Sequence, residues 1–131
     1  MNAKIVYKLD KQSYGLGTFE PQNALLLSMF LTADVGGSGK NFIKWFENPD
    51  NDCGSSNATQ YIVDEGVVTL TPAWKIDDDE CIAQGNYFQI TLDLMLQLLH
   101  LWEIIYKQEP LYIVITINDN QVDVTGSNVS F

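Results

Sequence analysis

Residues 91–110 have the sequence TLDLMLQLLHLWEIIYKQEP, and this stretch decides the fold. Thr91 is a good helix N-cap, and Asp93 would lie near the positive end of the helix dipole. The residues that follow are rich in leucine, a strong helix former, and Lys107 precedes the terminating pair Glu109 and Pro110. We therefore predict a helix over residues 92–108.

The polar residues of this helix recur every three or four positions and so form one narrow stripe. They are Asp93, Gln97, His100, Glu103 and Lys107. The rest of the circumference is apolar and must be covered. A sheet with a neighbouring helix, or a partner protein, would satisfy this requirement.

The flanking sequence predicts strands on both sides of this helix. Alternation or β-branched residues indicate strands over 4–9, 60–64, 67–74, 86–90, 111–117 and 121–125. Two pairs of these runs are joined by short turn sequences, Asp64-Glu65-Gly66 and Asn118-Asp119-Asn120, which favour hairpins.

Two further helices are predicted near the N-terminus. Residues 23–33 follow Pro21 and are good helix formers, and a shorter helix should carry Phe42, Ile43, Trp45 and Phe46. The order β-α-α-β-β-β-α-β-β predicts an α+β fold with a mostly antiparallel sheet and two to three helices packed on one face. With 131 residues, the chain is expected to form one domain over 1–131.

Two polar loops are expected. Residues 50–57 are almost entirely turn formers and predict a mobile loop that carries Asp50 and Asp52. Residues 75–85 predict a second loop, which contains the contiguous acids Asp77, Asp78, Asp79 and Glu80.

The charge balance is strongly acidic. Seventeen Asp and Glu residues against seven Lys and Arg give a formal net charge of -10 and an isoelectric point near 4.2. The negative electrostatic potential of such a protein repels phosphate backbones and anionic lipids, which argues against nucleic acid and membrane as ligands. It favours a basic partner or a cation, or it serves only to keep the protein soluble.

A cytoplasmic location is expected. No signal peptide is visible after Met1, and the apolar segment 92–106 is shorter than a membrane span. Cys53 and Cys81 match no metal-binding spacing and would stay reduced in that compartment.

Motifs for catalysis, cofactors or metals are not evident. The glycines at 36–39 precede Lys40 but lack phosphate-loop spacing, and His100 is the single histidine, which disfavours both a catalytic set and a zinc site. Four contiguous acids at 77–80 do not match a calcium loop. We predict no catalytic residues, no cofactor and no metal.

The aromatic residues near the two loops are Trp45, Phe46, Trp74 and Tyr87. Core packing is the general expectation for them, because large aromatics are highly buried on average. If Trp45 or Trp74 is exposed beside the acids, it becomes an interface anchor, because Trp and Tyr dominate binding hot spots.

Taken together, the acidic total, the acids at 77–80 and the α+β order resemble bacterial toxin-immunity proteins, including those of contact-dependent growth inhibition systems. The resemblance implies a cytoplasmic protein that neutralises a cognate toxin, often a basic nuclease, by covering its active site with carboxylates. The sequence leaves open whether the protein is a monomer or a homodimer. The expected partner-binding residues are Asp77, Asp78, Asp79, Glu80, Asp50, Asp52 and Trp74.

Two other classes stay open. A non-catalytic adaptor would bind through the apolar face of helix 92–108, and salt would then barely weaken its binding. An enzyme of unrecognised type would need a pocket that gathers His100 or a pair of acids.

Overall fold

The computed structural model describes residues 2–74 and 77–129 and confirms an α+β fold with antiparallel strands. The strands are β1 (Ala3–Asp10), β2 (Ser13–Tyr14), β3 (Thr18–Glu20), β4 (Cys53–Ser55), β5 (Thr59–Asp64), β6 (Val67–Pro72), β7 (Phe88–Thr91), β8 (Tyr112–Ile117) and β9 (Val122–Ser127). The helices are α1 (Ala24–Met29), the π-helical segment η1 (Phe30–Val35), α2 (Gly39–Glu47), α3 (Asp78–Ala83) and α4 (Leu92–Gln108).

The first sheet has the order β2-β1-β8-β9, and β3 pairs with β1 on the same side as β2. Along β1, Ile5 and Tyr7 are buried while Lys4 and Lys8 are exposed, which is the alternation expected of a half-buried strand. The closing hairpin of β8 and β9 is confirmed, with Ile117 paired to Val122.

The second sheet has the order β4-β5-β6-β7. Its β5–β6 hairpin is confirmed, because Glu65 and Gly66 have φ values of 49° and 76°, and a type I′ turn needs positive φ at both central residues. The predicted mobile loop over residues 50–57 is partly wrong. Cys53–Ser55 within it pairs with β5 as an edge strand.

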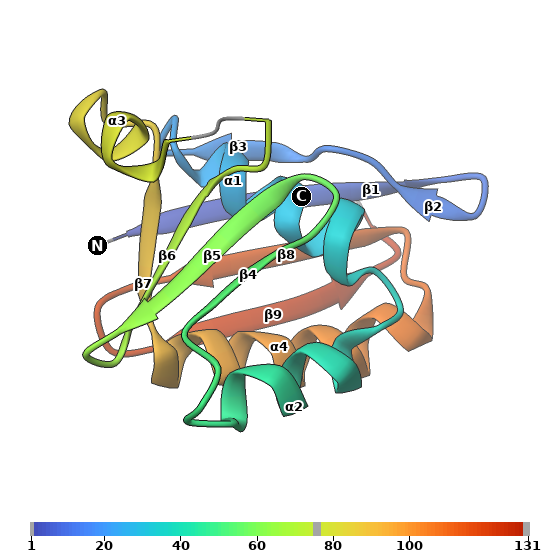
Figure 1. Cartoon of the computed structure of the whole chain (residues 1–131). Coiled ribbons are helices and arrows are strands. Elements are labelled where there is room, and N and C mark those ends of the chain that lie inside the picture. Colours follow the sequence, from blue (N-terminus) through green and yellow to red (C-terminus); the bar gives the residue numbers. More distant parts are fainter. Residues whose placement is uncertain (1, 75–76, 130–131) are drawn as a thin grey trace.

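The strands form two sheets because α1 and η1 are apolar on more than one side. Leu27, Phe30 and Leu31 are fully buried, and α1 contacts β1 and β3 of one sheet and β6 and β7 of the other. Figure 1 shows α1 between the two sheets. One continuous hydrophobic core therefore includes residues from both sheets and from the helices.

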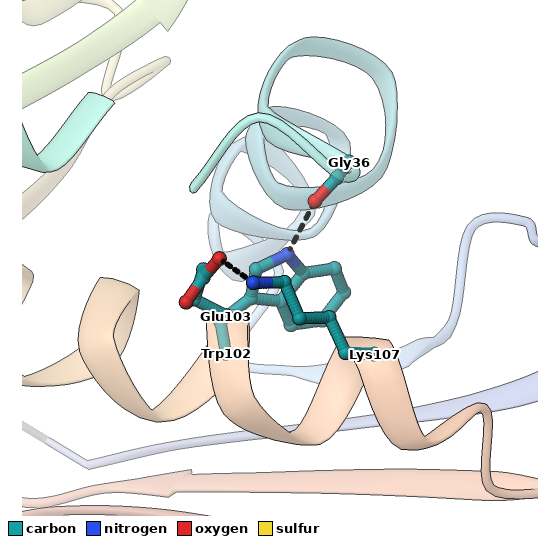
Figure 2. Close-up of polar contacts among 4 residues, drawn as sticks. All are labelled: Gly36, Trp102, Glu103 and Lys107. Atoms are coloured by element: carbon teal, nitrogen blue, oxygen red, sulfur yellow. Dashed lines mark hydrogen bonds and ion pairs between the residues drawn. The ribbon is translucent and has the colours of Figure 1, made fainter. Parts of the chain in front are cut away.

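Helix α4 confirms the prediction for residues 92–108, including the Thr91 cap, whose hydroxyl accepts a hydrogen bond from the Leu94 N–H. It packs against β9 and α2, so a sheet and a helix cover most of its apolar face. Its Trp102 is fully buried, and Figure 2 shows the indole N–H donating to the Gly36 carbonyl at 3.0 Å. This bond ties α4 to the end of η1.

The carboxylate of Asp34 joins η1 to the start of β5. Its Oδ1 accepts from the Ala58 N–H at 2.7 Å, and its Oδ2 accepts from the Thr59 N–H at 3.1 Å and the Thr59 hydroxyl at 2.6 Å. Thr59 is fully buried, so the carboxylate satisfies donors that water does not reach.

A buried hydrogen bond holds β1 against α1, and a close backbone approach fixes the loop before β3. The Tyr7 hydroxyl donates to the Ser28 carbonyl at 3.0 Å, and burial raises the pKa of Tyr7 well above its ordinary value. In the loop before β3, a Cβ on Gly17 would lie 2.3 Å from the Val6 carbonyl oxygen, so this position requires glycine. A Cβ on the nearby Gly15 would meet no atom within 4 Å.

Candidate protein-binding surface

The acidic run 77–80 is part of a helix, which corrects the prediction of a loop over residues 75–85. The Asp77 carboxylate caps α3 by accepting from the N–H groups of Asp79 and Glu80. Acids in a first helical turn are also favoured by the helix dipole. Lys75 and Ile76 of the predicted loop, and the side chain of Asp78, lie outside the described residues.

One turn of this helix is anchored to the body of the protein. Cys81 is 2% exposed, and its carbonyl accepts from the Asn86 N–H at 2.8 Å. The acids Asp77, Asp79 and Glu80 are exposed on the same helix. Helix α3 thus buries Cys81 and presents three described carboxylates to solvent.

Trp74 lies just beyond the end of β6 and is 62% exposed. The general expectation of core packing is therefore wrong for this residue. The expectation of core packing holds for Phe46, which is buried, and in part for Trp45 and Tyr87, which are half-buried. The Ala73 N–H donates to the Ala58 carbonyl at 3.0 Å, so the backbone that carries Trp74 is held while its indole faces solvent.

A groove of about 420 Å³ opens beside Trp74, and we refer to it as the Trp74 groove. Its apolar lining comes from Pro21, Leu25, Leu26 and Trp74, and its polar lining includes Gln22 and Gln84. Among the described residues, none that lines it carries a charge. The lining thus combines apolar side chains with uncharged amides.

The two walls of the groove are joined by one hydrogen bond. The Asn23 Nδ2 at the start of α1 donates to the Tyr87 carbonyl at 2.9 Å, directly before β7. Residues far apart in the sequence thereby form a fixed hollow. Sequence reasoning missed the Pro21 and Leu25 wall, because nothing local indicates that this turn meets the end of β6.

A local signal for α3 was present in the sequence. An Asp three residues before a Glu is the pattern of a capping box, and Asp77 and Glu80 have this spacing. Applied to residues 77–80, it would have predicted the helix start that the structure has.

The structure separates the expected partner-binding residues into two groups. Figure 1 shows α3 at the upper left, whereas the connection between α2 and β4, which carries Asp50 and Asp52, lies at the bottom. There the Val63 N–H donates to the Asp52 carbonyl at 2.7 Å, which places this loop near the β5–β6 turn. The groove beside Trp74 therefore reaches α3 through Gln84, which donates to Glu80, whereas Asp50 and Asp52 lie at the opposite end.

Helix α4 carries a second, shallower groove of about 450 Å³, lined by Asp93, Leu96, Gln97, His100 and Leu101. Ile104 on the same helix is 55% exposed. The predicted polar stripe is confirmed in that Asp93, Gln97, His100 and Lys107 are exposed.

Glu103 of the same stripe is half-buried and contacts Lys107, whose Nζ lies 2.5 Å from its Oε1 (Figure 2). The hydrogen bond from Lys107 lowers the pKa of Glu103 below its ordinary value, and the charges of Lys107, Lys40 and His100 add to this effect.

Comparison with known proteins found no matching family model, no similar curated protein and no similar solved structure. Over residues 2–74 and 77–129, no group of three or more His, Cys, Asp or Glu side chains could hold a metal ion. In that same part of the chain, the helices fall short of the length and apolar character needed to cross a membrane.

Proposed function

We propose that this protein binds a basic protein partner through Trp74 and the acids of α3, and that it acts as an immunity protein against a basic, nuclease-type toxin. The observation that carries the proposal is the exposed Trp74 indole at a groove that Gln84 also lines, since Gln84 donates to the exposed Glu80 carboxylate of α3. Asp77 and Asp79 are exposed on the same helix. Carboxylates of the inhibitor would cover the basic cleft in which the toxin holds its substrate.

Charge and the aromatic side chain would have different roles in this complex. Complementary charge accelerates encounter and selects the partner, whereas a desolvated Trp supplies affinity. The overall charge of -10 extends the attraction beyond α3 itself. An exposed Trp at the centre of an interface commonly contributes about 2 kcal/mol or more to binding.

The observation that favours a second function is the groove on α4, beside which Ile104 is exposed. An adaptor that binds through this face would bury apolar surface, and its binding would change little with salt. The two functions therefore differ in salt dependence and in the residues on which binding depends.

The test is capture of partners from the native lysate with three tagged proteins. These are the wild type, an α3 variant (D77N, D79N, E80Q) and an opposite-end variant (D50N, D52N, D64N) that removes the same number of charges. Asn at position 77 keeps an N-cap, so the α3 variant should fold. We expect the wild type and the opposite-end variant to retain the same basic protein at low salt, and the α3 variant to lose it.

The captured partner is then assayed for nuclease activity in the complex and after separation. Activity that is absent in the complex and present after separation supports the immunity function. Equal capture by all three proteins would contradict the proposed surface, and loss of capture on substitution of Ile104 by Glu would support the adaptor instead.

A further inference from the structure

The inference concerns the Trp74 groove and rests on the proposed function, because it specifies what the partner places there. We infer that the groove binds one aliphatic or aromatic side chain carried by a segment of the partner that is otherwise rich in Lys and Arg. The α3 acids would contact the flanking cations.

The lining of the groove determines the first part of this inference. The described lining carries no charged group, so a charged side chain would lose hydration there with only uncharged amides to replace it. An apolar side chain would bury its surface favourably against Leu25, Leu26 and Trp74. Ligand pockets typically measure about 300–1,000 Å³. At about 420 Å³ the groove is at the small end of this range, which suits a side chain and its adjoining backbone.

The charges outside the groove determine the second part. Asp77, Asp79 and Glu80 are exposed on α3. Gln84, an uncharged residue of the groove wall, donates a hydrogen bond to the Glu80 carboxylate at 3.1 Å. Glu80 is therefore bonded to a residue of the groove wall, and Asp77 and Asp79 are exposed on the same helix. A segment with Lys or Arg next to its apolar side chain would place both groups favourably at once.

The charge also argues against a second copy of this chain as the occupant. Two chains of charge -10 repel one another, and the repulsion is strongest where the acids concentrate. The groove is also already formed in the unbound chain, since Asn23 bonds to the Tyr87 carbonyl across its walls and Asp77 caps α3. A preformed site loses less entropy on binding.

The test begins with selection of peptides from a random 12-residue display library on the wild-type protein, without any selection against Trp74→Ala. We expect the enriched peptides to contain one Leu, Ile, Met, Phe or Trp flanked by Lys or Arg. Their affinity for Trp74→Ala should be at least about 30-fold lower, and that for Trp74→Phe less than about 10-fold lower.

The place of binding is checked by ¹⁹F NMR of protein labelled with 5-fluorotryptophan. The chain has three tryptophans, and the Trp74 signal is the one missing in Trp74→Phe. A synthetic copy of the most enriched peptide should shift the Trp74 signal and leave the signal of Trp102, which is fully buried, unchanged.

Several outcomes would overturn the inference. Enriched peptides that are acidic or wholly polar would do so, as would equal binding to Trp74→Ala or a shift of the Trp45 signal alone. A Trp74 signal that moves with protein concentration in the absence of peptide would assign the groove to a second copy.

Failure of the inference can be separated from failure of the proposed function. If the α3 variant loses the captured partner while Trp74→Ala retains it at full affinity, the inference about the groove and the role given to Trp74 are wrong, whereas the immunity function through the acids of α3 stands. If the wild type captures no basic partner, the proposed function is wrong, whatever the peptides show.

Discussion

Replacement of Asp34 by Ala should destabilise the protein by about 3 kcal/mol, because one carboxylate accepts three hydrogen bonds between η1 and β5. A hydrogen bond to a charged group contributes about 1.5–3 kcal/mol, but bonds that share one acceptor group do not add, and the site is only partly buried. The main cost is that the Thr59 hydroxyl and N–H are left without a partner in the interior. Asp34→Asn keeps one acceptor oxygen and should cost about half as much.

The assay is urea unfolding followed by circular dichroism, and a parallel thermal scan should show a fall in Tm of about 10 °C for Asp34→Ala. A double-mutant cycle with Thr59→Val tests the mechanism. The double variant should have nearly the same stability as Asp34→Ala, because Thr59→Val removes the hydroxyl that Asp34→Ala leaves without an acceptor. A loss below about 1 kcal/mol for Asp34→Ala, or full additivity in the cycle, would refute the reasoning.

Three further predictions concern single positions. Gly17→Ala should lower the free energy of unfolding by about 2 kcal/mol or more, because the new Cβ meets backbone that cannot move freely. Gly15→Ala should change it by no more than about 0.5 kcal/mol, and urea unfolding of both variants measures the difference. Tyr7→Phe should cost about 1 kcal/mol at pH 7. Since the folded pKa of Tyr7 is raised, wild-type stability falls as the pH rises above 10, and the deficit of the variant should shrink between pH 9 and about 11 in a series of unfolding curves. Lys107 lowers the pKa of Glu103, so the stabilising effect of the Glu103 carboxylate is present above its ordinary pKa of 4.5 and is lost as the pH falls below that value. Glu103→Gln should therefore lose less stability on acidification than the wild type. A series of unfolding curves from pH 6 to about 3 measures the difference.

The elements that sequence predicts well are those defined by local patterns. Helix α4 combines a cap, a dipole-compatible acid and a leucine-rich run within residues 91–108, and the structure has the same bounds. The β5–β6 hairpin depends only on the turn at residues 64–66, and Glu65 and Gly66 adopt the positive φ values that the turn requires. Each pattern lies within a few residues, so no knowledge of the distant chain is needed.

The division of strands into two sheets could not be predicted in the same way. It depends on which strands pair across long separations, such as β1 with β8, and on α1 lying between the sheets. The alternation within each strand shows that one face is buried but not against what. Short edge strands such as Cys53–Ser55 carry too few residues to form a pattern of their own.

The candidate surface was only partly predictable for a related reason. The acids at 77–80 and Trp74 are close in the sequence, so their proximity in space was expected. Asp50 and Asp52 looked equivalent by charge, yet the fold carries them to the opposite end of the molecule (Figure 1). The groove itself joins residues near Pro21 to residues near Gln84, and only the tertiary structure brings these together.

The most direct test of the central claim is the association rate constant of the captured basic partner with the wild type, the α3 variant and the opposite-end variant, measured over a salt series. Charge attraction raises association rates strongly at low salt, and at 1 M salt the screening length falls to about 3 Å. We predict that the α3 variant associates at least about tenfold more slowly than the wild type at low salt, that the opposite-end variant stays within about twofold, and that the three rates converge at high salt. Equal rates for the two variants at low salt, or a wild-type rate that salt does not change, would contradict a binding surface formed by Trp74 and the acids of α3.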